Sequence, residues 1–87
     1  MKVSFSDRGW EEYQHWQDTD RRMLRRVNQL IKDIIRSPYD GIGKPETLRH
    51  QLAGFWSRRI DDEHRLVYWV TETTVEIVSC RYHYTRS

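Results

Sequence analysis

Cysteine is almost absent from this chain of 87 residues, and its scarcity excludes one kind of stabilisation. Cys80 is the single cysteine, so no internal disulfide can form. The histidines also lack the spacing of paired zinc ligands, such as two residues four positions apart; they are His15, His50, His64 and His83. We therefore expect no metal site and no cofactor.

Long apolar runs are missing as well. The chain has no stretch of about eighteen apolar residues, as a membrane-spanning helix would need, and no charged segment followed by an apolar one, as in a secretory signal. We therefore expect a soluble protein of the reducing cytoplasm with no membrane partner.

Two further kinds of catalytic site lack their motifs. No glycine-rich loop precedes a Lys-Ser or Lys-Thr pair, which argues against a nucleotide-binding P-loop. No nucleophile-elbow motif surrounds Ser57, Ser79 or Cys80. Nucleotide-dependent and serine or cysteine nucleophile mechanisms are therefore disfavoured.

Aromatic residues, in contrast, are plentiful. The chain has four Trp, five Tyr and two Phe, whereas disordered chains are poor in aromatics. A chain of this length has room for one compact core, in which most of these rings would be buried. We expect residues 1–87 to form a single domain, with residues 85–87 as a frayed tail.

Positive charge is segregated along the chain, although the net charge is only +2. Residues 21–36 contain six basic residues and one acid, Asp33. A second basic group comprises Lys44, Arg49, Arg58, Arg59 and Arg65. This distribution suggests a basic face that binds a polyanion, although a solvated helix face explains the charges equally well.

Two helices are predicted in the first half of the chain. Residues 2–5 alternate as in a short strand, after which Ser6 can cap a helix that ends near Asp18 or Thr19. Phe5 and Trp10 would form its hydrophobic staple. Thr19 or Asp20 can cap a second helix, which Ser37-Pro38 stops. Its apolar stripe consists of Met23, Leu24, Val27, Leu30, Ile31, Ile34 and Ile35.

Strands are predicted in the second half. Residues 37–47 are rich in turn formers, and they precede three strand-like segments at 55–60, 65–71 and 75–84. The pattern predicts an α+β fold, with two N-terminal helices packed on one face of a mainly antiparallel four- to five-stranded sheet. The other face would be free for a partner or substrate.

The residue types also permit one metal-free reaction. Cleavage of an RNA phosphodiester needs a base for the ribose 2′-OH, positive charge at the phosphate, and an acid for the leaving oxygen. Glu, Arg and His can fill these roles. Most small basic domains contain all three types, however, and a glutamate in a turn is more commonly a solvated carboxylate. Spacing alone therefore assigns no site.

A family resemblance is more specific. The segments Gly43–Arg49 (GKPETLR), Leu52–Ile60 (LAGFWSRRI), Glu63–Tyr68 (EHRLVY) and Cys80–Tyr84 (CRYHY) resemble the Txe/YoeB group of the RelE toxin superfamily. The N-terminal part is similar too, around Trp10, Tyr13 and Trp16. The resemblance extends from Met1 to Tyr84.

This resemblance implies a RelE-like fold and cleavage of mRNA in the decoding site of the ribosome. It assigns the general base to Glu46, phosphate stabilisation to Arg65 and the general acid to His83. Tyr84 would lie near the substrate, where aromatic rings stack on unpaired RNA bases. Arg59 would bind substrate, as would Arg49, where the family has lysine. The change from a point cation to a planar fork makes the role of Arg49 less directly transferable.

The resemblance also implies partners: a YefM-like antitoxin, the 70S ribosome, mRNA and a second toxin copy in a homodimer. In this interpretation, one basic cluster would grip ribosomal RNA; it comprises Arg21, Arg22, Arg25 and Arg26. Two alternatives stay open. ParE-like members of the superfamily bind DNA gyrase without cleaving RNA, and a basic RNA-binding domain needs no chemistry at all.

Strand alternation raises a difficulty for the assigned site. If residues 61–64 form a turn, Ile60 lies opposite Arg65, and Val70 lies opposite Val75 across the next turn. An unbroken last strand would then place His83 on the opposite face from Arg65. We therefore predict a β-bulge, a shifted register or a strand that ends before His83.

Overall fold

The computed structural model describes residues 1–82. The sequence predictions for His83, Tyr84 and the 85–87 tail lie outside these residues. The elements are β1 (Lys2–Phe5), α1 (Asp7–Thr19), α2 (Arg21–Arg36), β2 (Glu46–Thr47), the 3₁₀ helix η1 (His50–Leu52), β3 (Trp56–Arg59), β4 (Arg65–Val70) and β5 (Thr74–Ser79). Within residues 1–82, neither α-helix is long and apolar enough to cross a bilayer.

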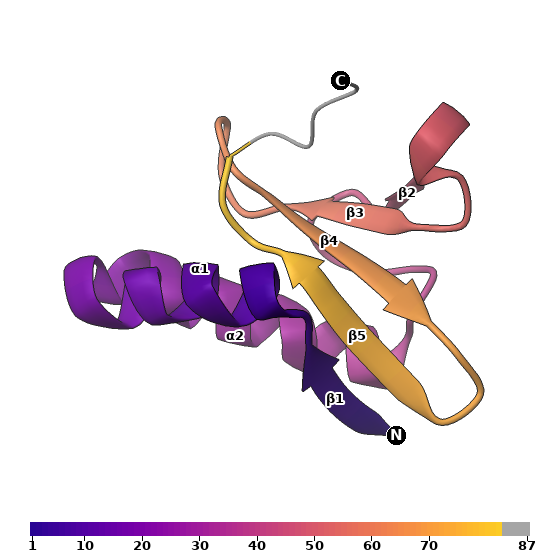
Figure 1. Cartoon of the computed structure of the whole chain (residues 1–87), viewed down its shortest axis with the longest axis horizontal. Coiled ribbons are helices and arrows are strands. Elements are labelled where there is room, and N and C mark those ends of the chain that lie inside the picture. Colours follow the sequence, from indigo (N-terminus) through magenta and orange to yellow (C-terminus); the bar gives the residue numbers. More distant parts are fainter. Residues whose placement is uncertain (83–87) are drawn as a thin grey trace.

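The strands form one sheet of five, in the order β1-β5-β4-β3-β2. β1 runs parallel to β5, and the other pairs are antiparallel. The two α-helices lie side by side against one side of the sheet (Figure 1). The predicted α+β fold, with two helices on a mainly antiparallel sheet, is confirmed.

Helix boundaries follow from local side chains. The Ser6 hydroxyl accepts a hydrogen bond from Gly9 N at 3.0 Å and caps α1. The rings of Phe5 and Trp10 lie 5.5 Å apart, as the predicted staple requires. Asp20 Oδ1 accepts from the N–H groups of Arg22 and Met23 in the first turn of α2, and α2 ends at Arg36, before Ser37-Pro38. Both helix predictions are confirmed.

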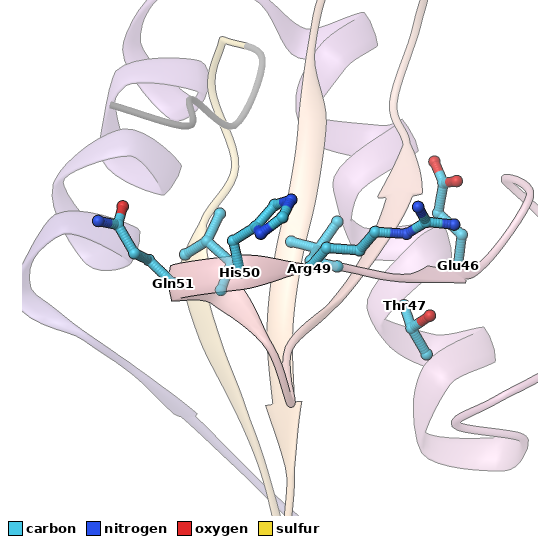
Figure 2. Close-up of a pocket in the computed structure, with 7 residues that line it drawn as sticks. Glu46, Thr47, Arg49, His50 and Gln51 are labelled. Atoms are coloured by element: carbon cyan, nitrogen blue, oxygen red, sulfur yellow. The ribbon is translucent and has the colours of Figure 1, made fainter.

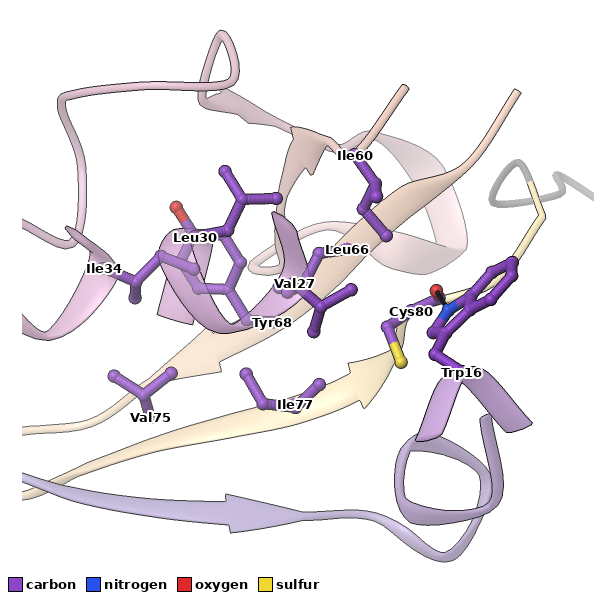
Figure 3. Close-up of a cluster of buried hydrophobic side chains, with 10 residues drawn as sticks. All are labelled: Trp16, Val27, Leu30, Ile34, Ile60, Leu66, Tyr68, Val75, Ile77 and Cys80. Carbon is purple, nitrogen blue, oxygen red and sulfur yellow. Dashed lines mark hydrogen bonds between the residues drawn. The ribbon is translucent and has the colours of Figure 1, made fainter. Parts of the chain in front are cut away.

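The core lies between α2 and the central strands. Val27, Leu30 and Ile34 of α2 are fully buried and pack with side chains of the sheet (Figure 3), including Leu66, Tyr68, Val75 and Ile77. Because side chains alternate along a strand, the residues between these positions point to the other side of the sheet. We call that side, away from α1 and α2, the site face.

The register of β5 against β4 shifts once. Val70 lies opposite Val75 as predicted, and Tyr68 lies opposite Ile77, but Val67 lies opposite Ser79. Val78 is therefore the extra residue of a bulge. β5 ends at Ser79, five residues before the predicted end at Tyr84. The predicted irregularity before His83 is confirmed, and the predicted length of the strand is wrong.

Two other strand predictions need correction. Arg59, not Ile60, lies opposite Arg65, because Ile60 N donates to His64 O at 2.9 Å and the turn closes one residue tighter. Ile60 is accordingly buried in the core. The segment that the sequence predicted as turns also contains β2, a strand of two residues that pairs with β3.

Arg58 does not belong to a basic surface. Its side chain is fully buried, with Nη1 2.6 Å from Asp33 Oδ2 and Nε 3.1 Å from the Tyr68 hydroxyl. Nη2 donates to the carbonyls of Ser37 and Asp40. Arg58 therefore ties the 37–42 loop to the end of α2 and to the sheet.

Candidate functional site

Three predicted site residues share the site face on neighbouring strands. Glu46 of β2 lies opposite Ser57 of β3, and Arg59 lies two residues further along β3. Arg59 in turn lies opposite Arg65 of β4. Cross-strand partners and residues two apart point to the same face, so the sheet brings Glu46, Arg59 and Arg65 together.

The strand pairing sets the backbone separation of Glu46 and Arg65. Glu46 and Arg65 are two strands apart, about 10 Å across the sheet, and one row apart, about 7 Å along it. Long side chains cover much of this separation.

A pocket of about 350 Å³ opens beside Glu46 and is lined by residues 46–52. Figure 2 shows the Glu46 carboxylate, the Arg49 guanidinium and the His50 ring on the same side of the chain, with Arg49 extending toward Glu46. Thr47 points the other way. Arg49 thus lies beside Glu46 at this pocket.

The Arg65 side chain is held in place by the turn before it. Arg65 is 7% exposed, and its Nη1 donates to the carbonyls of Asp61 at 2.8 Å and His64 at 3.1 Å. Within residues 1–82, the hydrogen bonds of this guanidinium all come from Nη1. Nε and Nη2 are thus the atoms that could serve a phosphate.

The C-terminal segment approaches the same place through the backbone. Arg65 N donates to Tyr82 O at 3.0 Å, and Tyr82 directly precedes His83 in the sequence. The chain connectivity therefore attaches His83 to a residue that is hydrogen-bonded to Arg65.

The sequence interpretation missed two side chains near Glu46. His50 lines the pocket and has a positive φ of 57°, a conformation uncommon for residues other than glycine. Ser57 is 1% exposed, and within residues 1–82 its hydroxyl is a buried group without a hydrogen-bond partner. His50 directly follows the family-like segment Gly43–Arg49, and this position is a signal that the spacing of metal ligands does not carry.

The predicted ribosome-binding arginines lie at the start of α2. Arg22, Arg25 and Arg26 line a groove together with Ile60 and Asp61, and Arg21 is exposed beside them. Arg26 is partly engaged within the protein, because it donates to the carbonyls of Arg59 and Ile60, each at 3.2 Å.

Among residues 1–82, no three His, Cys, Asp or Glu side chains gather as metal ligands would.

Comparison with known proteins connects the chain to a family. The sequence model described as "YoeB-like toxin of bacterial type II toxin-antitoxin system" matches residues 5–84. The chain is 55% identical to Toxin YoeB of Escherichia coli over 84 residues, covering 97% of this chain and 100% of that protein. Toxin YoeB of Streptomyces coelicolor is 54% identical, with the same coverage.

Solved structures agree with the sequence match. A YoeB/ParE toxin from Agrobacterium tumefaciens superimposes with a TM-score of 0.94 at 45% identity, covering 97% of this chain and 100% of that one. A YoeB dimer from Staphylococcus aureus gives 0.90 at 45% identity, covering 97% and 98%. The chain therefore belongs to the family of YoeB-like toxins of bacterial type II toxin–antitoxin systems.

Proposed function

We propose that this toxin is a metal-independent endoribonuclease that cleaves mRNA on the 70S ribosome. The observation that carries the proposal is the shared site face of Glu46, Arg59 and Arg65 on three neighbouring strands. A carboxylate and two guanidiniums around one phosphate suit acid–base phosphodiester chemistry. Because its target is the ribosome, the protein would act in the cytoplasm.

In the proposed mechanism, Glu46 takes the proton from the ribose 2′-OH. The 2′-oxygen then attacks the adjacent phosphorus, and the bond from phosphorus to the 5′-oxygen breaks. His83 gives a proton to that oxygen, so the products are a 2′,3′-cyclic phosphate and a 5′-hydroxyl. Arg65 stabilises the negative charge that builds on the phosphate, Arg49 and Arg59 bind the strand, and Tyr84 stacks on a base.

The proposed partners follow the family. Solved structures of the Staphylococcus aureus relative include a dimer and a heterotetrameric YoeB-YefM complex. By analogy, this toxin would form a homodimer and bind a YefM-like antitoxin. Arg21, Arg22 and Arg25 would contact ribosomal RNA, with Arg26 helping where its backbone contacts allow.

The decisive experiment compares Glu46→Ala with the wild type on a message under translation. Losing the base should lower cleavage by about a hundredfold or more, and wild-type fragments should carry cyclic phosphate or 3′-phosphate ends. Glu72→Ala, in the exposed β4–β5 turn, is the matched control and should cleave normally. Equal cleavage by a folded Glu46→Ala variant would reject the role of Glu46.

A second variant and a gyrase assay distinguish the nuclease from the gyrase-binding alternative. His83→Ala should also lower cleavage, because the leaving oxygen loses its proton donor. If the wild type cuts no RNA on ribosomes but inhibits purified DNA gyrase, the alternative function is correct.

A further inference from the structure

The chain that leaves β5 is anchored to α1 at Cys80. The backbone N–H of Cys80 donates to Glu12 Oε1 at 2.8 Å, and its carbonyl accepts from Trp16 Nε1 at 2.8 Å. Glu12, Trp16 and Cys80 are all buried. Both backbone groups of Cys80 are thus used by side chains of one helix, which fixes where the chain departs from the sheet (Figure 3 shows Trp16 beside Cys80).

Two residues further, Tyr82 is held on both sides by the start of β4. Its N–H donates to Nδ1 of His64 at 2.7 Å, and its carbonyl accepts from Arg65 N at 3.0 Å. Tyr82 has a φ of 65°, a strained conformation that persists only where the surroundings hold it. The contacts from His64 and Arg65 provide such a hold.

The contact with Tyr82 determines which nitrogen of the His64 ring accepts a hydrogen bond. A backbone N–H can only donate, so Nδ1 must be unprotonated, and the neutral ring carries its hydrogen on Nε2. The ring is 9% exposed and packs edge-on against Trp16, with centroids 5.0 Å apart. Trp16 therefore supports the ring that holds Tyr82, in addition to binding Cys80 directly.

We propose that His64 is a positioning residue for the general acid: its Nδ1 fixes the Tyr82 backbone, and thereby the point from which His83 extends. The proposal rests on the proposed nuclease function. His64 lies next to Arg65 in the sequence, so one dipeptide both holds the segment that precedes the acid and supplies the proposed phosphate-binding guanidinium. A small misplacement of a catalytic group can cost a large factor in rate.

Two amide variants test this with nearly the same chemistry. The oxygen of His64→Asn can take the place of Nδ1, whereas the longer His64→Gln carries its amide to the place of Nε2. We expect His64→Asn to keep kcat within about threefold of the wild type. His64→Gln should lower kcat by about ten- to a hundredfold and should raise KM by a much smaller factor, because Arg49 and Arg59 are untouched and only the proposed Tyr84 contact shifts with the segment.

The control is His15→Gln. His15 also packs edge-on against Trp16, with centroids 4.9 Å apart, so its loss disturbs the same indole without removing the acceptor for Tyr82. Normal kcat is expected. If the two His64 variants lose activity in equal measure, or neither does, the positioning role is wrong.

A readout independent of RNA cleavage is hydrogen exchange at the Tyr82 amide. The amide should be protected in the wild type and in His64→Asn, and should exchange at least about tenfold faster in His64→Gln. This measurement does not depend on RNA cleavage. It therefore distinguishes a failure of His64 to hold the Tyr82 backbone from a failure of the proposed nuclease function. Equal exchange in all three proteins would overturn the inference.

Discussion

The carboxylate of Asp33 in α2 connects the helix to the 37–42 loop and to β3. It accepts hydrogen bonds from Arg36 at 2.6 Å, from Arg58 at 2.6 Å and from Ile42 N at 3.0 Å. These contacts, the Arg36 hydrogen bond foremost and the Arg58 hydrogen bond next, lower the pKa of Asp33 from 3.8 to about 2. The ionised form is therefore favoured by folding.

This lowered pKa predicts an acid-sensitive contribution to stability. The contribution is complete above the ordinary pKa of 3.8 and is lost as pH falls toward about 2. Asp33→Asn should therefore lose stability at neutral pH and show a flatter pH dependence between pH 2 and 4 than the wild type. Urea midpoints across this range measure the difference, with the exposed Asp18→Asn as control. Parallel wild-type and Asp33→Asn curves would contradict the assignment.

Cys80 gives a second prediction about a single residue. Burial, and secondarily the charge of Glu12, raise the pKa of its thiol to about 12. Because the thiolate is the reactive form, native protein at pH 8 should not react with iodoacetamide, whereas protein in urea should react fully. Mass spectrometry distinguishes the two states. Rapid labelling of the folded protein would show that Cys80 is accessible.

Arg58 marks the limit of sequence reasoning about single residues. The sequence reveals that a positive charge stands at this position, but its partner Asp33 is 25 residues away. Only the folded chain shows that the guanidinium is buried rather than part of a basic surface. The prediction that Glu46 and Arg65 are site residues likewise depends on the family resemblance and not on charge or spacing.

Among the elements, the packing of α1 on β5 depends on Gly9. A Cβ at this position would lie 2.3 Å from the carbonyl oxygen of Ile77, which is too close for any side chain. Gly9→Ala should therefore destabilise the protein by about 1–3 kcal/mol, although alanine favours helices. Gln14→Ala, on the exposed side of α1, should have little effect. Denaturant unfolding of both variants tests this, and a more stable Gly9→Ala variant would refute it.

The sequence predicted the helices well because their signals are local. Ser6 and Asp20 as caps and Pro38 as a stop act within a few residues of the helix ends. The strands were harder. β2 has two residues, too few to show an alternating pattern.

The register of the hairpin between β3 and β4 depends on one side chain. Asp61 Oδ1 accepts from the N–H groups of Glu63 and His64 and so tightens the turn. The predicted pairing was therefore wrong by one residue.

At the scale of the whole molecule, the site face and the start of α2 offer two separate basic surfaces. The site face contains Glu46, Arg59 and Arg65. The start of α2 contains the exposed Arg22 and Arg25. If the second surface binds ribosomal RNA, the ribosome positions the toxin against the message and thereby contributes to the rate of RNA cleavage. Free RNA should then be a poor substrate.

The double variant Arg22→Glu/Arg25→Glu tests this division. Two lost phosphate contacts should weaken ribosome binding, and with it cleavage at limiting toxin, by about tenfold or more at moderate salt. Stability should stay within about 0.5 kcal/mol, because both side chains are exposed. Lys32→Glu, further along the same helix, is the control. Unchanged cleavage by the double variant would remove α2 from the ribosome interface.

The parallel pairing of β1 with β5 has a consequence for synthesis. The first strand, β1, pairs only with residues 74–77 of β5, so the five-stranded sheet cannot close until these residues have emerged from the ribosome. Contacts between residues so far apart in sequence form late in folding. A nascent chain whose residues beyond 73 are still inside the ribosome therefore lacks β5, the pairing partner of β1, and also the Tyr82 segment that is hydrogen-bonded to His64 and Arg65.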